Sequence, residues 1–253
     1  MRQEVYVLSR PQKLFVVCTA IFITALVIAE ATSTKFFTAF TLPSPLHLFG
    51  MTFREVVMTT GVLAFPVTFI ITDLMNEYFG KKGIRFVTLV GMVMIGFEFL
   101  LLQAAIAVPV ASISPVSQEA FEAVFGTTGR IILGSLTAYL LGQLADITLF
   151  HWLRGLTQGR FLWLRATGST FGSQFIDTFV VLTIAFAGQL AFQQILAITL
   201  FNYGYKLLIA IAITPLIYLA HWAMDAYLGK ELAHQLTAKA AADQLKAPFS
   251  GKA

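Results

Sequence analysis

Charged residues are scarce in this chain of 253 residues. They make up 12% of it, whereas hydrophobic residues make up 57%. Ordinary soluble domains contain about 25% charged residues and about 45 to 50% apolar residues. A soluble fold of this length could not bury so much apolar surface. The composition therefore argues against a soluble domain and predicts a membrane protein.

Residues that carry catalytic or metal chemistry are also few. The single cysteine, Cys18, cannot form an internal disulfide, and no pair of histidines stands at ligand spacing. The sequence lacks a glycine-rich phosphate loop and a nucleophile elbow, which argues against an ATPase and against hydrolase chemistry. We therefore expect no metal, no cofactor and no enzymatic activity.

Long apolar runs, by contrast, fill most of the chain. Each approaches or exceeds the roughly 20 residues that a helix needs to cross a bilayer core of about 30 Å. The sequence therefore predicts an all-α membrane protein with one domain of six transmembrane helices over residues 1–230 and a polar tail over residues 231–253. The six predicted spans are Leu14–Ala31, Val56–Ile71, Phe86–Val108, Ile131–Leu153, Ser169–Ala187 and Ile195–Ala220.

Two features lie outside this simple pattern of spans. Residues 118–125, between the third and fourth spans, have the periodicity of a short amphipathic helix at the membrane interface. The string Ala29-Glu30-Ala31 at the end of the first span resembles a signal-peptide cleavage site. The apolar run before it is long for such a signal, so we expect the first span to be retained.

The basic residues are distributed like topology signals. Thirteen of the seventeen flank one side of the predicted spans, three flank the other side, and Lys206 lies within a span. Because basic residues concentrate on the cytoplasmic side of membrane proteins, this asymmetry predicts that both termini are cytoplasmic. The basic residues form no single soluble patch, so we expect no nucleic-acid partner.

Several ionisable residues lie inside the predicted spans, where a charge costs about 2.5 to 3.5 kcal/mol and is a functional-site hypothesis by default. Where the helix of the second span would continue past Ile71, Asp73, Asn76 and Glu77 share one helical face. An interfacial acidic cap would explain them, but carboxylates are unfavourable at a helix C-terminus, which favours a cavity wall. Glu98, without a basic residue on its own helix, is either protonated, paired with another helix or part of a proton route.

The fourth span carries two patterns on one helix. Tyr139, Gln143 and Asp146 form a polar stripe that must face a cavity or another helix. A second stripe of small residues is typical of close helix packing. It consists of Gly134, Ala138 and Gly142.

The fifth and sixth spans supply a carboxylate and a lysine. Ser169, Ser173 and Asp177 repeat every four residues, and Lys206 lies one turn after Asn202. The serines alone are typical of packing between membrane helices. Lys206 could pair with Asp177 or Asp146, and the sequence leaves open whether such a pair is structural or contacts a substrate.

Several of these strings occur in a characteristic order from about Phe65 to Tyr218. They resemble the queuosine-precursor transporter family, also called the vitamin uptake transporters. The resemblance rests on Phe65-Pro66, Thr72-Asp73, Asn76-Glu77, Gly80-Lys81-Lys82, Phe121 to Gly126, Arg130, Ser135, Ala138-Tyr139, Gln143, Asp146, Trp163, Ser169-Thr170, Asp177-Thr178, Asn202-Tyr203, Lys206 and Pro215.

The resemblance implies a multi-pass protein of the bacterial inner membrane that imports 7-cyano-7-deazaguanine and 7-aminomethyl-7-deazaguanine. Its partners would be this small deazapurine and the lipid bilayer, and whether it forms a homo-oligomer stays open. A carboxylate could accept both donors of the guanine-like edge, an amide could address the carbonyl, and aromatic rings could stack on the base. The candidate substrate-binding residues are Asp73, Asn76, Glu77, Glu98, Tyr139, Gln143, Asp146, Ser169, Ser173, Asp177, Asn202, Tyr203 and Lys206.

Two other functions remain as alternatives. The first is a membrane-embedded vitamin-binding subunit that depends on a separate energising complex, for which the seam of Gly134, Ala138 and Gly142 could be the docking surface. The second is an intramembrane enzyme built on Ser169, Asp177 and Lys206. It is disfavoured because no local motif defines a nucleophile and its base.

Overall fold

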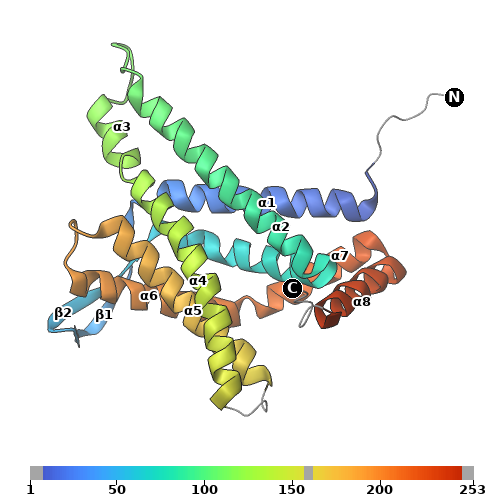
Figure 1. The fold of residues 1–253 in the computed structure, drawn as a ribbon. Helices are drawn as coiled ribbons and strands as arrows, with labels where there is room; N and C mark the ends of the chain where they lie inside the picture. The colour runs from blue at the N-terminus through green and yellow to red at the C-terminus, as the bar shows by residue number, and fades with distance from the viewer. Residues whose placement is uncertain (1–7, 157–161, 247–253) are drawn as a thin grey trace, which may run out of the picture. The chain divides into compact units, whose positions relative to one another are not determined.

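The protein is described by a computed structural model that covers residues 8–156 and 162–246 (Figure 1). Some side chains within the fourth, fifth and eighth helices lie outside this description. The elements in chain order are α1 (Arg10–Thr32), β1 (Phe36–Leu48), β2 (Met51–Thr59), the short 3-10 helix η1 (Thr60–Ala64), α2 (Phe65–Ala107), α3 (Gln118–Phe125), α4 (Thr128–Leu156), α5 (Leu162–Phe186), α6 (Phe192–Ala212), α7 (Thr214–Leu228) and α8 (Lys230–Lys246).

The chain is mostly helical and has the features of a multi-pass membrane protein. Among the described residues, four helices are long and apolar enough to cross a bilayer: Arg10–Thr32, Thr60–Ala107, Gln118–Gly142 and Phe192–Ala212. Large apolar side chains are widely exposed, such as Val93 at 71% and Ile211 at 73%. Exposed apolar surface on this scale is what lipid contact requires. The number of six spans stays a prediction.

The second predicted span begins later than expected. Its first residues, from Val56, belong to β2, and the helix starts at Phe65 with Pro66 in its first turn. Val56 and Val57 are β-branched and therefore suit a strand as well as a helix. The boundary predicted from hydropathy was therefore wrong, because apolar content alone does not separate a strand from a helix.

The predicted second and third spans are joined at Gly80 without a loop. Helix α2 runs through both, and its only non-helical residue is Gly80, with φ 67° and ψ −177°. This backbone conformation is essentially restricted to glycine. Gly80 therefore divides α2 into two helices, and Lys81 to Arg85 lie in a helix instead of a connecting loop.

A β-hairpin that the sequence did not predict follows α1. Strands β1 and β2 are antiparallel, and Leu48 pairs with Met51 across a two-residue turn. Phe49 and Gly50 both have positive φ, at 54° and 77°, as hairpin turns of this length require. Figure 1 shows the hairpin as a ribbon of two strands.

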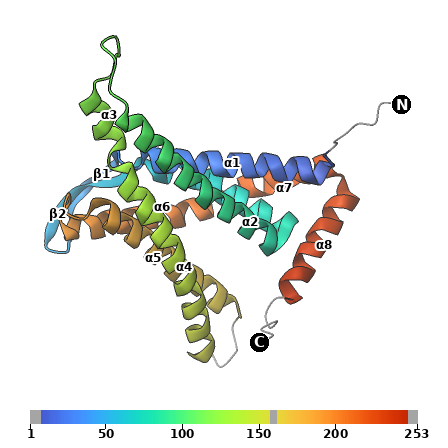
Figure 2. The same cartoon turned by 45° about the horizontal axis from the view of Figure 1, so that its top comes forward.

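The described chain forms two compact units. Among the described residues, unit 1 consists of residues 8–28, 63–95 and 208–246, and unit 2 consists of residues 29–62, 96–156 and 162–207. The core of unit 1 includes Met75 and Val87 of α2, both fully buried, and Met224 of α7. Helix α8 turns away from α7 at Gly229, which has φ 87° (Figure 2). Ala233 of α8 is part of the same core.

In unit 2, α4 and α5 lie side by side in both views (Figures 1 and 2). A Cβ atom at Gly134 would lie 3.0 Å from the main-chain oxygen of Val181, and Ala138 is fully buried. The small residues of α4 therefore allow the close helix packing predicted from their spacing. Helix α6 adds Ile195 and Ile198 to the apolar core beside this pair.

Helices α3, α6 and α7 test two further predictions from the sequence. Helix α3 confirms the expected short helix, and the Ser117 side chain accepts a hydrogen bond from the Ala120 N–H at its start. The predicted sixth span, Ile195–Ala220, is interrupted at Ile213, between α6 and α7. Pro215 in the first turn of α7 explains this break, because proline lacks the N–H that a continuous helix would need.

Candidate functional site

Lys206 of α6 contacts two side chains of α5. Its Nζ lies 3.6 Å from Asp177 Oδ2 and donates a hydrogen bond of 3.0 Å to Thr178 Oγ1. The Lys206 and Asp177 side chains are 19% and 32% exposed. Of the two acids that the sequence offered to Lys206, the structure brings Asp177 to it, and the side chain of Asp146 lies outside the described residues.

Glu30 is a buried acid that the sequence prediction of the site omitted. It lies near the end of α1, is 8% exposed, and its Oε2 accepts a hydrogen bond of 2.9 Å from Ser135 Oγ of α4. Glu98 of α2 and Asp177 of α5 belong to the same unit 2. The sequence did contain a signal for Glu30, because an ionisable residue inside a predicted span is a functional-site hypothesis by default.

Glu98 lies in the part of α2 that belongs to unit 2. Its Oε2 is buried and has no hydrogen-bond partner among the described residues. Buried polar atoms are nearly always satisfied, so an exception points to a bound group or to a change in protonation. The sequence left three explanations for Glu98: protonation, pairing with another helix, or a proton route. Within the described part of the chain, no ion pair between Glu98 and a basic residue is seen.

Asn202 is 3% exposed and stands one turn before Lys206 on α6. Its Nδ2 donates a hydrogen bond of 2.9 Å to the main-chain oxygen of Ile198, whereas Oδ1 is buried without a partner among the residues described. Oδ1 therefore offers a ligand a hydrogen-bond acceptor, and Nδ2 keeps its second N–H donor.

Other predicted residues lie around this group. The Tyr203 hydroxyl donates a hydrogen bond of 3.1 Å to the main-chain oxygen of Phe171, and its ring packs edge-on against Phe175 with centroids 5.5 Å apart. Ser173 is buried, and a Cβ atom at Gly142 would lie 3.8 Å from its main-chain oxygen. Tyr139 is half-buried on α4. The side chains of Gln143, Asp146 and Ser169 lie outside the described residues.

We group these residues as a candidate site within unit 2, the unit 2 polar cluster, in which Glu30 contacts Ser135 and Lys206 contacts Asp177 and Thr178. Its members come from α1, α2, α4, α5 and α6 and combine three carboxyl groups, one ammonium group, two hydroxyls and one amide. The cluster consists of Glu30, Glu98, Ser135, Asp177, Thr178, Asn202 and Lys206.

The acids of the predicted second span have different surroundings, in unit 1. Asp73 Oδ2 lies 3.4 Å from His221 Nε2, and the Tyr78 hydroxyl donates a hydrogen bond of 2.6 Å to Asp225 Oδ1. The Tyr78 and His221 rings stack with centroids 5.5 Å apart. We call Asp73, Tyr78, His221 and Asp225 the α2–α7 network. Asn76 and Glu77, also predicted as site residues, are exposed.

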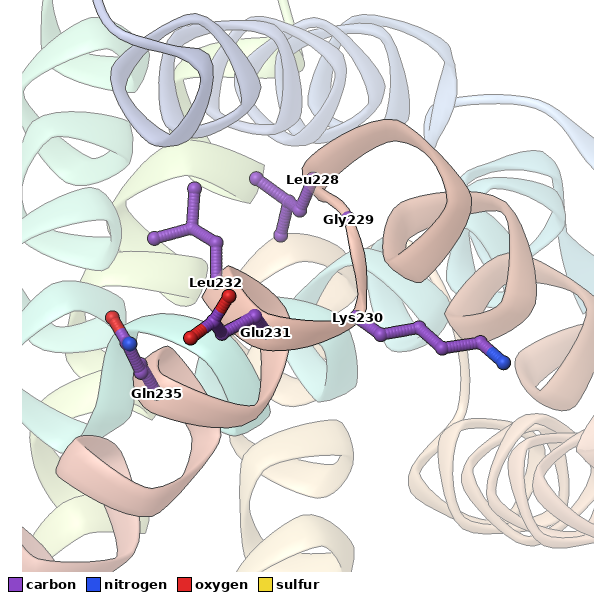
Figure 3. Close-up of a pocket in the computed structure, with 6 residues that line it drawn as sticks. All are labelled: Leu228, Gly229, Lys230, Glu231, Leu232 and Gln235. Carbon is purple, nitrogen blue, oxygen red and sulfur yellow. The ribbon is translucent and has the colours of Figure 1, made fainter.

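A hollow at the junction of α7 and α8 contains none of the predicted site residues (Figure 3). Its two charged side chains, Lys230 and Glu231, extend in opposite directions. They therefore do not converge on a ligand. Among the described residues, no group of three His, Cys, Asp or Glu side chains could hold a metal ion.

Comparison with known proteins gives a family and named relatives. A family profile described as "Putative vitamin uptake transporter" matches residues 59–220. A "Probable queuosine precursor transporter" of Bacillus subtilis (strain 168) is 33% identical over 181 residues, which cover 69% of this chain and 74% of the relative. No solved structure matches the chain.

Two further relatives carry related names. The "Queuosine precursor transporter" of Escherichia coli (strain K12) is 30% identical over 160 residues, which cover 60% of this chain and 67% of the relative. The "Probable queuosine precursor transporter" of Haemophilus influenzae (strain ATCC 51907 / DSM 11121 / KW20 / Rd) is 36% identical over 129 residues, and the match spans 51% of this chain and 52% of that protein.

These matches bear on two predictions from the sequence. The relatives are named as transporters, which confirms that the chain is not an enzyme. The profile covers more than half of the chain and includes every predicted site residue from Asp73 to Lys206, although it leaves out Glu30. The resemblance indicated by the motifs is therefore confirmed, and the chain belongs to the vitamin uptake transporter family.

Proposed function

We propose that this protein imports queuosine precursors, 7-cyano-7-deazaguanine and 7-aminomethyl-7-deazaguanine, across the bacterial inner membrane. The names of its relatives support this substrate class. The structural observation that carries the proposal is the contact of Asp177 with Lys206 beside the buried, half-satisfied amide of Asn202. Carboxylates and amides kept inside apolar helices are typical of substrate pathways.

The chemistry of the precursors suits these side chains. A guanine-like edge presents an N1–H and a 2-amino group, and the Asp177 carboxylate can accept hydrogen bonds from both. Asn202 Oδ1, which has no partner among the described residues, would accept a hydrogen bond from a further donor of the ligand. The second N–H of Asn202 Nδ2 or the amide of Gln143 would donate to the ligand carbonyl.

Aromatic side chains would hold the ring of the substrate. Stacking of a base on an aromatic side chain contributes about 1 to 3 kcal/mol. The hydroxyl of Tyr203 is anchored to Phe171 and its ring is supported by Phe175. Such anchoring reduces the entropy that the ring loses when a ligand binds. Tyr139, half-buried on α4, is the second candidate.

We also propose the membrane topology that the basic residues predict, with six spans over residues 1–230, both termini in the cytoplasm and residues 231–253 as a polar tail. Cysteine labelling in intact cells tests it. A Lys81→Cys variant, built on a Cys18→Ala background, should be inaccessible to a membrane-impermeant reagent, and an Arg54→Cys variant should react. Outside labelling at position 81 would contradict this topology.

Packing against α5 explains the seam of small residues on α4, so the seam does not require an energising complex. Gly134 and Ala138 face α5 at close range, and a Cβ atom at Gly142 would lie 3.8 Å from that of Asp177. The seam is therefore occupied by packing within the chain and is not a free docking surface. This observation favours an autonomous carrier over a binding subunit.

Uptake by cells that cannot synthesise the precursors tests the function. Such cells should accumulate labelled 7-cyano-7-deazaguanine only when they carry this gene, and a Glu55→Gln variant on the exposed hairpin should match the native protein. The purified protein in liposomes without any ATPase should exchange internal for external precursor. Absence of uptake in both assays would refute the proposal, and uptake that needs an added ATPase complex would favour the binding subunit.

A further inference from the structure

The charges of the unit 2 polar cluster do not balance among the side chains that the structure describes. The cluster holds three carboxyl groups, from Glu30, Glu98 and Asp177, and one ammonium group, from Lys206. Lys206 contacts Asp177 and Thr178. A charge buried without a counter-ion is far more costly than a buried neutral group. The cluster therefore gains stability if it takes up a proton.

Glu30 is the carboxyl group best placed to take that proton. It is 8% exposed, and the group that touches it is a neutral hydroxyl, Ser135 Oγ, at 2.9 Å. The hydroxyl donates to the carboxylate and so stabilises its charged form, but it brings no positive charge that could take the place of a proton. Glu98, whose buried Oε2 lacks a partner among the described residues, is the second carboxyl group that could share the proton.

The other elements around Glu30 carry few competing charges. Helix α2 carries Glu98 in unit 2, and helix α5 carries Asp177, which is in contact with Lys206 of α6. On α4, the Arg130 side chain instead donates a hydrogen bond to the main-chain oxygen of Ala187. The side chain of Asp146, also on α4, lies outside the described residues.

We propose that Glu30 binds the proton that drives transport. This inference rests on the proposed function, to which it adds the coupling ion. A Glu30 carboxylate takes up one proton to become the neutral acid, the proton crosses the membrane together with one precursor, and it is released on the other side. No other reactant is required.

The coupling between proton binding and substrate binding follows from electrostatic repulsion between Glu30 and the other carboxyl groups of the cluster. Two like charges in one poorly hydrated cluster repel each other, so neutralising Glu30 lowers the cost of keeping the charged contact between Asp177 and Lys206. The ionised carboxylate is the form that accepts both donors of the guanine-like edge. Proton binding and substrate binding therefore favour each other, and by linkage the substrate must also favour protonation.

A proton suits this cluster better than a metal cation. Within the described residues, no three His, Cys, Asp or Glu side chains converge as metal ligands. Cations such as Na⁺ and Ca²⁺ need several oxygen ligands, whereas a proton needs a single carboxyl group. The hydroxyl of Ser135 is sufficient to hold the carboxyl of Glu30 in place.

The test uses the full-length protein in liposomes with labelled 7-cyano-7-deazaguanine in sodium-free buffer. With the membrane potential clamped at zero, an inward proton gradient should drive accumulation, at most about tenfold per pH unit for one proton. Exchange of internal for external precursor without any gradient reports binding and conformational change alone. The two assays separate coupling from transport itself.

Glu30→Gln is the decisive variant, because the amide keeps the size of the side chain and its contact with Ser135 but cannot bind or release the proton. It should lose gradient-driven accumulation and retain exchange. Glu119→Gln, the same substitution at an exposed residue of α3, should behave like the native protein. Ser135→Ala should move the pH of half-maximal uptake upward, since it removes a hydrogen bond that stabilises the charged carboxylate.

Each outcome decides between the two proposals. Accumulation by the native protein without a proton gradient, or driven by sodium instead, overturns the inference and leaves the proposed function intact. Native-like accumulation by Glu30→Gln also overturns it. Failure of the native protein to exchange any precursor overturns the function and the inference together. If Glu30→Gln does not fold in detergent, the Ser135→Ala variant tests the role of Glu30 in its place. An unchanged pH of half-maximal uptake in Ser135→Ala would then refute that role.

Discussion

The acids of this chain occur in two contrasting environments. In the unit 2 polar cluster, Glu30 is buried against a neutral hydroxyl and Glu98 has an unsatisfied oxygen. In the α2–α7 network of unit 1, Asp73 and Asp225 are exposed, and each contacts a titratable partner at 3.4 Å and 2.6 Å. The comparison shows that helical spacing reveals which acids share a face, whereas burial and partners separate a site from a structural contact.

The largest effect is expected at Asp177. The change Asp177→Asn keeps the size of the side chain but places a donor where the two donors of the precursor need acceptors. Hydrogen bonds to a charged group contribute about 1.5 to 3 kcal/mol each, so uptake should fall by at least about 100-fold. Uptake of labelled precursor in cells and the melting temperature in detergent measure activity and folding separately.

Asp73→Asn is the matched substitution in unit 1, and it should reduce uptake far less. An equal loss in both variants would break the comparison between the two environments. Asp146→Asn should resemble Asp177→Asn if both acids line one cavity. Normal uptake by both Asp177→Asn and Asp146→Asn would remove these residues from the site.

Lys206→Met should act chiefly on stability if its contact with Asp177 is structural. Loss of the ammonium leaves a carboxylate without its counter-ion and should lower the free energy of unfolding by about 3 kcal/mol. The double variant with Asp177→Asn should recover most of this loss. Measuring unfolding in detergent together with uptake distinguishes this structural role of Lys206 from contact with the substrate. If Lys206 contacts the substrate, the single variant should stay folded and lose uptake.

Gly80→Ala tests a backbone feature of unit 1 that involves no charge. With φ 67° and ψ −177°, alanine would be strained by about 2 kcal/mol. We expect a lower melting temperature in detergent, with uptake per folded molecule preserved. Gly204→Ala is a suitable control, because a Cβ atom there would meet nothing within 4 Å and φ is ordinary. Equal stability of the two variants would contradict the non-helical backbone conformation at Gly80.

The smallest effect is expected in the α2–α7 network. Tyr78→Phe removes the hydrogen bond to Asp225, and because Asp225 is exposed we expect a loss of about 1.5 kcal/mol, the low end for a bond to a charged group. Uptake per folded molecule should not change. Reduced uptake in a stable Tyr78→Phe protein would show that the network takes part in transport.

Features encoded by local spacing were predictable from the sequence. The small residues of α4 indicated close packing, and α5 provides it at Gly134. The short helix α3 followed from its periodicity and begins at the expected Gln118. The pairing of Lys206 was narrowed to two acids, but choosing Asp177 required the three-dimensional arrangement of α5 and α6.

Two features were not predictable, one because its local sequence is atypical and one because it depends on distant packing. The hairpin turn uses Phe49 and Gly50 instead of a typical Asn-Gly pair, and prolines at positions 43 and 45 weaken the strand pattern of β1. Glu30 was interpreted only as part of a cleavage-like string. Its relevance comes from Ser135, which lies more than a hundred residues away in the sequence and which no periodicity could connect to it.

The close approach of α4 and α5 has a consequence for the transport cycle. Alternating access requires parts that rock as rigid bodies, and two helices locked by a glycine against a main-chain carbonyl cannot slide past each other. We therefore expect α4 and α5 to move together, carrying Asp177 with them. Since Lys206 sits on α6, its contact with Asp177 crosses the edge of this block, and the exchange between inward-facing and outward-facing states would stretch or release it at every turnover.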